Sequence, residues 1–340
     1  IEQSPYDTLR RFYREWYRPD LMAVIAVGDF DPEVVVSLIK EKFSSLLNPP
    51  REKTRVLYPV PDHNNLLVGI ATDKEATYSS IDIEYKFPVE EAKTVKDYRT
   101  MLIEQLFITM LDRRYSELIQ QPDPPFTFAS SNYSSLVRTK AAYSNFAVVK
   151  DNGIERGLQT LLEENERVQQ FGFTQTEFDR ARKEIVRRTE KSYNERDKTE
   201  SRNFAREYVS YFLEHEPSPG IAWEYKMQQE LLPAISLAEV NALASKWITS
   251  GKNCVILVNA PEKAGVIIPS EDQIRKIFND AQQMQVSAYV DQVSTAPLME
   301  KQPMPSKVIN EDRISAYNIT QWTLANGVKV ILKPTDFKND

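Results

Sequence analysis

The stretch WYRPDLMAVIAVGDFDP, residues Trp16–Pro32, decides how the rest of the chain is interpreted. Its apolar run predicts a buried strand between two turns, and its last residues predict the start of a helix. Asp31 suits the N-cap and Pro32 the first turn of that helix, which we expect over residues 33–43. A strand this apolar needs neighbours on both sides, yet only 15 residues precede Trp16. We therefore interpret the stretch as the end of a domain.

The composition is that of an ordinary soluble globular protein, with 41% hydrophobic residues, 27% charged residues and a net charge of -6 over 340 residues. Acidic and basic residues are mixed along the chain, so no basic patch indicates nucleic-acid binding. No apolar run approaches the ~18 residues of a membrane span. The chain starts at Ile1 without a signal peptide, so we expect an internal piece of a longer protein.

Apolar periodicity predicts an alternation of strands and helices along the rest of the chain. We expect strands at 66–71, 81–87, 126–131, 141–149 and within 247–261, and helices at 94–120, 154–170, 173–214 with a break near Asn194, 223–232, from Ser236, and 271–280. Residues 281–313 lack a sustained period and predict a linker. A strand pair around the Asn326-Gly327 turn closes the chain over 322–334.

Two helices carry a full set of start signals. Thr174 and Glu177 form one predicted capping box, and Ser236 and Glu239 form the other. The charged run at 190–202 within the first of these helices has two interpretations. It is either a solvated helix face or one charged wall of a large cavity.

The apolar strand at Trp16 has a counterpart later in the chain. WYRPDLMAVIAVGD from Trp16 aligns with WITSGKNCVILVNA from Trp247 at a constant offset of 231 residues. Chance similarity of two buried strands is the alternative, but the matching order of helix, turn, strand and helix favours a repeat. The repeat predicts four segments: the tail of a truncated first domain at 1–50, a complete domain at 51–280, a linker at 281–313 and the start of a third domain at 314–340.

Residues able to carry chemistry are few. His63 and His215 are the only histidines and lie 152 residues apart, so no pair has the spacing of a zinc site. No G-x-S-x-G motif occurs, and Cys254 opens an apolar run that predicts a buried core thiol. Gly28 is a single glycine and predicts a turn rather than a nucleotide loop. We therefore assign no catalytic, cofactor-binding or metal-binding residue to this sequence.

The boundary motifs resemble those of the pitrilysin/insulinase-type zinc metallopeptidases, the inverzincins. The first motif in that family reads roughly Y-x-P-x-N-M-x-L-x-V-x-G-D, and Asp20 and Leu21 depart from the usual neighbours. The second motif is the L-x-N-G-x-x-V strand pair that opens domains of the family, and the central region, with YSNFA from Tyr143, is similar to the family's non-catalytic domain. The matching positions are Tyr17, Pro19, Met22, Val24, Val27, Gly28, Asp29, Leu324, Asn326, Gly327 and Val330.

The resemblance implies a duplicated α+β fold of antiparallel sheets and helices, and a parent enzyme that binds zinc through an H-x-x-E-H helix. That motif is absent here, so the resemblance implies a non-catalytic segment that encloses peptide or unfolded protein substrates together with the other domains of the same chain. It implies no bound zinc in this segment. The lack of disulfides and the large multi-domain plan fit a bacterial periplasm or cytoplasm equally well. The alternatives are a metal-free scaffold or processing subunit with the same fold, and an unrelated stand-alone binding domain.

Overall fold

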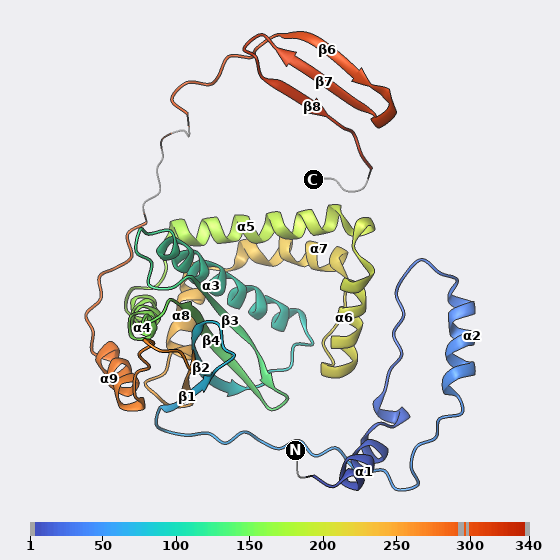
Figure 1. Ribbon diagram of the computed structural model, residues 1–340, viewed down its shortest axis with the longest axis vertical. Coiled ribbons are helices and arrows are strands. Elements are labelled where there is room, and N and C mark those ends of the chain that lie inside the picture. The colour runs from blue at the N-terminus through green and yellow to red at the C-terminus, as the bar shows by residue number, and fades with distance from the viewer. Residues whose placement is uncertain (1–3, 292–295, 297–298, 337–340) are drawn as a thin grey trace.

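A five-stranded sheet forms the centre of the computed structural model, which describes residues 4–291, 296 and 299–336 (Figure 1). The strands lie in the order β1, β5, β2, β4, β3, and β1 alone runs parallel to its neighbour. Their bounds are β1 Leu67–Asp73, β2 Ser79–Pro88, β3 Phe128–Val137, β4 Lys140–Val149 and β5 Cys254–Pro261. Together with the helices this sheet confirms the predicted α+β class.

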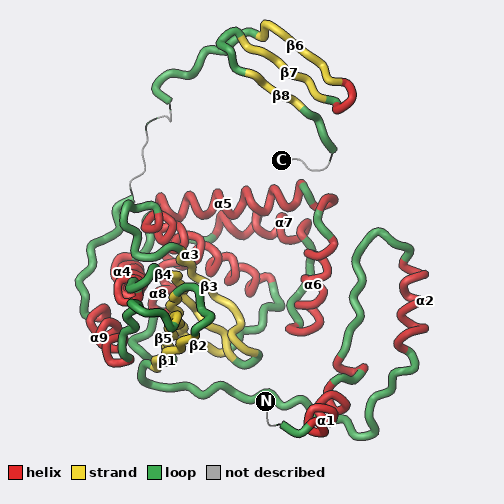
Figure 2. Tube along the Cα trace, viewed as in Figure 1, coloured by secondary structure: helices red, strands yellow, loops and turns green. Residues whose placement is uncertain are grey.

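Helices cover the face of the sheet on which Ile81, Ile83 and Tyr85 point into the core (Figure 2). Helices α3, α4 and α9 contact strands of the sheet, α8 packs on α3 and α4, and α5 packs between α3 and α7. Their bounds are α3 Val95–Ile119, α4 Ile154–Phe171, α5 Gln175–Asn194, α6 Ser201–Glu214, α7 Ile221–Leu231, α8 Leu237–Trp247 and α9 Glu271–Gln282, with the short η2 Arg196–Lys198 and η3 Leu232–Ala234 between them. No helix among the described residues is long and apolar enough to cross a membrane.

An aromatic cluster joins the sheet to the helices. Trp247, fully buried at the end of α8, stacks on Tyr133 and Tyr143 at ring-centroid distances of 4.8 and 5.0 Å. Phe107 from α3 meets the same indole edge-on at 5.1 Å. Stacked and edge-on aromatic pairs add to the stabilisation from buried apolar area, so this cluster fixes how α3 and α8 lie on β3 and β4.

The predicted capping boxes at Thr174 and Ser236 are confirmed, with side-chain bonds in both directions to Glu177 and Glu239. The predicted break near Asn194 is also confirmed, because α5 ends there and α6 follows after a 3-10 turn. A capping box satisfies helix N–H groups that have no partner within the helix, which explains why these helices begin where the sequence predicts.

The predicted buried strand within Trp16–Pro32 is wrong for this structure. The N-terminal region contains α1 Tyr6–Trp16, a 3-10 turn at Pro19–Leu21 and α2 Pro32–Phe43, with Asp31 as the expected N-cap. Residues 22–27 between them form no strand, and Met22 and Val24 are 44% and 46% exposed. A strand needs a hydrogen-bonded neighbour, and the sheet strands of the described residues pair with other partners. The repeat copy at Trp247 does contain a strand, β5, because β1 and β2 flank it.

The C-terminal region contains one strand more than predicted. Strands β6 Val308–Ile314, β7 Ile319–Leu324 and β8 Lys329–Leu332 form a separate antiparallel sheet in that order, and Gly327 adopts a φ of 86° in the predicted β7–β8 turn. The predicted linker at 281–313 therefore includes most of β6, whose polar sequence VINEDRI gives no alternating apolar signal. Residues 292–295 and 297–298 of that linker lie outside the described residues.

Candidate functional site

The histidines and the cysteine do not form a reactive centre. The His63 ring Nδ1 lies 2.7 Å from the carbonyl oxygen of Asn65, and His215 ends α6 in a left-handed conformation. Cys254 is fully buried in β5, and burial raises its pKa to about 12, so the predicted core thiol is confirmed and stays protonated. Within residues 4–291, 296 and 299–336, no three His, Cys, Asp or Glu side chains are placed to hold a metal ion.

The face of the sheet opposite the helices carries a pair of carboxylates. Asp82 and Glu84 are two residues apart on the central strand β2, so both side chains point to this open face. Burial raises the pKa of Asp82, and burial together with the neighbouring Asp82 charge raises the pKa of Glu84 to about 7. Neither carboxylate has an ion pair among the described residues.

Most of the side chains directly opposite this pair are apolar. Phe146 of β4 and Leu257 of β5 lie directly opposite Asp82, and Val255 lies opposite Glu84. Directly opposite residues share a face of the sheet, so these side chains lie beside the carboxylates. They explain the burial that raises the two pKa values, and they make the open face a mixed apolar and acidic wall.

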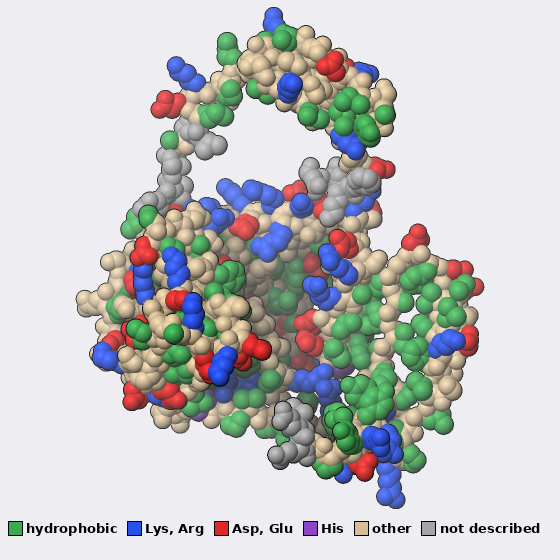
Figure 3. Space-filling view, in the orientation of Figure 1, with side chains coloured by type: hydrophobic (Ala, Val, Ile, Leu, Met, Phe, Trp, Pro, Cys, Tyr) green, Lys and Arg blue, Asp and Glu red, His purple; other side chains and the backbone are tan. Residues whose placement is uncertain are grey.

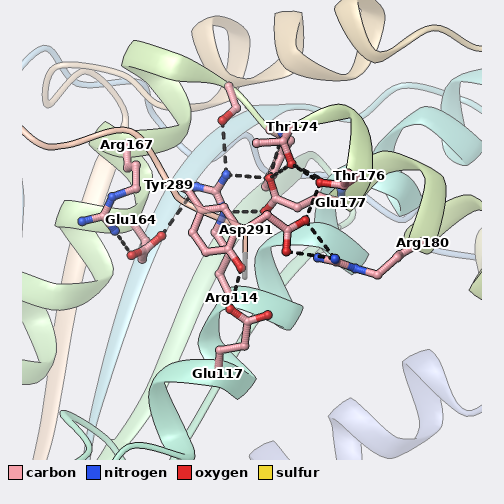
Figure 4. Close-up of polar contacts among 12 residues, drawn as sticks. Arg114, Glu117, Glu164, Arg167, Thr174, Thr176, Glu177, Arg180, Tyr289 and Asp291 are labelled. Carbon is pink, nitrogen blue, oxygen red and sulfur yellow. Dashed lines mark hydrogen bonds and ion pairs between the residues drawn. The ribbon is translucent and has the colours of Figure 1, made fainter. Parts of the chain in front are cut away.

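A second polar centre lies inside the helical layer, where Arg114 of α3 is 2% exposed (Figure 4). Its Nε and Nη2 donate to the two carboxylate oxygens of Glu177 at 2.7 and 3.0 Å, and Nη2 also donates to the Gly172 carbonyl oxygen. Its Nη1 faces Glu164 of α4 at 3.7 Å. Glu177 is already fixed by the capping box of α5, because the Thr174 backbone N–H donates to it at 2.7 Å. The centre therefore ties α3, α4 and the start of α5 together.

The segment after α9 lies over this centre. The Tyr289 ring lies 4.3 Å from the Arg114 guanidinium, and its hydroxyl donates to Glu117 at 2.5 Å. Asp291 pairs with Arg180 at 2.8 Å. Burial acts to raise the pKa of Asp291, but hydrogen bonds from Arg180 and a threonine outweigh it and lower the pKa. We call residues 284–291 the strap, since these contacts hold them across α3 and α5 (Figure 4).

A cavity of about 710 Å³ lies between the strap and the helices. Its wall carries both cations and carboxylates, and these pair with each other, as Arg167 does with Glu164 and Arg180 does with Asp291. The wall therefore offers no surplus charge to a ligand. The geometry supports a structural tie between the strap and the helices.

Neither polar centre was predicted from the sequence. Arg114 lies four residues after Met110 on the apolar stripe of the predicted helix, and an arginine at such a position signals a buried ion pair. The acidic pair lies within the alternation that predicts strand 81–87, and no role was assigned to it. A solvated face and a half-buried one give the same alternation, so sequence alone does not separate them.

Comparison with known proteins places the chain in a family. Residues 5–185, more than half of the chain, match the family described as the peptidase M16 inactive domain. The chain therefore belongs to this family, which confirms the predicted pitrilysin-type resemblance and agrees with the prediction of a non-catalytic domain.

Individual relatives cover the whole chain. It is 31% identical over 341 residues to a "Zinc protease PQQL-like" of Arabidopsis thaliana, an alignment that covers 100% of this chain and 33% of the relative. It is 24% identical over 331 residues to the "Probable zinc protease PqqL" of Escherichia coli, covering 95% and 35% of the two chains. The crystal structure of the periplasmic protease PqqL from Escherichia coli shares the fold, with a TM-score of 0.72 at 20% identity over 97% of this chain and 36% of that one. The chain thus spans about a third of the length of these relatives.

Proposed function

We propose that this chain is a non-catalytic segment of a multi-domain zinc metalloendopeptidase and helps to enclose and bind its peptide or unfolded protein substrates. The observation that carries the proposal is the match to the peptidase M16 inactive domain in a chain that aligns with a third of proteins named zinc proteases. The zinc ligands and the general base would then lie elsewhere in the parent protein. The open face of the five-stranded sheet is the surface we assign to the substrate side, because the helices of the described residues pack on the other face.

The proposed domain organisation follows the four predicted segments. Residues 1–50 would complete the preceding domain, which is supported by α1 and α2 having no buried residues. Residues 51–280 contain the five-stranded sheet and its helices. Residues 281–313 would connect this domain to the next, and the end of this segment would already form β6, which pairs with β7 and β8. The proposed compartment is a bacterial periplasm or cytoplasm, and the periplasmic description of the Escherichia coli relative supports the former.

Sequencing the gene around the region that encodes this chain tests the parent activity. We expect an H-x-x-E-H motif within about 200 codons upstream, since that motif supplies two zinc ligands and the base in inverzincins. Its absence would refute the peptidase proposal and favour the metal-free scaffold or processing subunit.

Metal analysis and cleavage assays test the role of the chain itself. The purified 340-residue chain should hold well below one zinc per molecule after dialysis and should leave a quenched-fluorescence peptide library intact. The parent protein should cleave that library and lose activity on chelation. One tightly held zinc per chain, or cleavage by the chain alone, would contradict the assignment.

A further inference from the structure

A groove runs between α5 and the α7–η3 segment, away from both polar centres described above. Its volume is about 620 Å³. One wall is formed by α5 and the other by the end of α7 with the following 3-10 turn. We call it the α5–α7 groove, and its lining includes Arg182, Lys183, Val186, Arg187, Gln228 and Leu232.

Positive charge dominates the rim of the α5–α7 groove. Arg182, Lys183 and Arg187 line it against a single carboxylate, that of Glu190. Lys183 and Arg187 are exposed and have no ion pair or hydrogen bond to another described side chain. Figure 3 shows lysine and arginine side chains gathered along α5 on this side of the molecule. An anionic group entering the groove would therefore meet cations that are free to pair with it.

The bottom of the groove offers a hydrogen-bond acceptor and apolar surface. Gln228 is 7% exposed, and its Nε2 donates to the Tyr98 hydroxyl at 3.5 Å. Its Oε1 is buried and has no hydrogen-bond partner among the described residues. Buried polar atoms are normally paired, so this oxygen marks a place for a donor such as a peptide N–H. Val186 and Leu232 beside it provide contacts for an aliphatic side chain.

We propose that the α5–α7 groove binds a peptide segment that carries a carboxylate side chain next to an aliphatic one. The carboxylate pairs with Lys183 and Arg187, the aliphatic side chain packs on Val186, and a backbone N–H donates to Gln228. An inorganic anion fits less well, because it supplies no apolar surface and its charge is repelled by the free Oε1 of Gln228. The proposal concerns a binding site on the helical side of the chain and does not depend on zinc or on cleavage.

Fluorescence anisotropy with a short labelled peptide of alternating glutamate and leucine tests the groove in the 340-residue chain. A glutamine–leucine peptide of the same length is the matched probe. We expect saturable binding of the glutamate peptide that weakens as salt rises, and at least about tenfold weaker binding of the glutamine peptide. Free inorganic phosphate should compete poorly.

Two variants locate the contact. Arg187→Glu reverses a charge on the groove and should weaken binding at least about tenfold. Arg188→Glu makes the same charge change on the next residue, which does not line the groove and lies 3.9 Å from Glu184, and should change binding less than about twofold. Circular dichroism should show that both variants fold. Gln228→Leu should weaken both peptides about equally, because it removes the acceptor for the backbone.

Three results would overturn the proposal. One is absence of saturable binding of the glutamate peptide, and another is equal affinity for the glutamine peptide. The third is equal weakening by the Arg187 and Arg188 variants, which would indicate a diffuse charge effect. Each of these results leaves the family assignment and the proposed parent activity untouched.

Discussion

Replacing Arg114 with methionine provides a sharp test of the buried polar centre. The substitution removes two hydrogen bonds to Glu177, one to the Gly172 carbonyl and the 3.7 Å ion pair with Glu164. Both carboxylates then stay buried without this cation, although each keeps another partner, Thr174 or Arg167. Breaking a buried ion pair by removing one partner costs about 3–5 kcal/mol, and the remaining partners place our expectation at about 3 kcal/mol.

The adjacent residue supplies the control. Arg113 is 54% exposed in its side chain and pairs with Glu184 at 3.0 Å, so Arg113→Met should cost about 0–1 kcal/mol. Urea unfolding followed by far-ultraviolet circular dichroism measures both free energies. A loss below about 1 kcal/mol for Arg114→Met, or equal losses for the two variants, would refute the reasoning. The double variant Arg114→Met with Glu177→Gln should recover part of the loss, because it removes an unpaired buried charge.

Three further predictions concern a carboxyl, a glycine and a cap. The pKa of Glu84 is raised to about 7 in the folded state from a usual value near 4.5. The stability gained from protonating this carboxyl is therefore complete below pH 4.5 and is lost as pH rises through 7. Glu84→Gln should therefore melt higher than the wild type at pH 8, by an amount that shrinks toward pH 4. Gly172→Ala should lower the free energy of unfolding by about 2 kcal/mol or more, because φ is 71° and the new Cβ would lie 2.5 Å from the Asn241 side chain. Gly265→Ala is the control: its Cβ would meet no atom within 4 Å, so it should lower the free energy of unfolding less. Ser236→Ala should cost about 1 kcal/mol in urea unfolding, and an unchanged stability would contradict the role of its capping box.

Local signals in the sequence predicted most of the main body. Helix starts such as Thr174 could be predicted because a capping box involves only four consecutive residues. Strand β2 could be predicted because its apolar side chains alternate along the sequence. The apolar run after Trp16 was misassigned for the same local reason. Its composition favours a strand, but a strand forms only beside a hydrogen-bonded neighbour, which can lie far away in the sequence. Among the described residues, 22–27 have no such neighbour.

The polar centres could not be predicted in the same way. Glu164 and Glu177 meet Arg114 only because α4, α5 and α3 converge on it, and sequence separations of about 50 to 63 residues carry no periodic signal. Asp82 and Glu84 were visible in the sequence, but their raised pKa values depend on Phe146 and on β5, which reach them through sheet pairing. The sequence therefore shows which residues are ionisable, whereas their burial and their partners depend on the fold.

The strap also determines how mechanical force would enter the domain. Tyr289 is bonded to Glu117 of α3, and Asp291 is paired with Arg180 of α5. Two separate helices therefore bind the chain within three residues. A pull on the polypeptide beyond Asp291 would load these two attachments together before it reached α9. Arg114 also connects α3 to α5, through its hydrogen bonds to Glu177, and contacts the Tyr289 ring. The force would therefore be distributed over the helical layer and would not unwind a single helix from its end. The strap is thus an anchor point that shares a load applied at Asp291 between two helices.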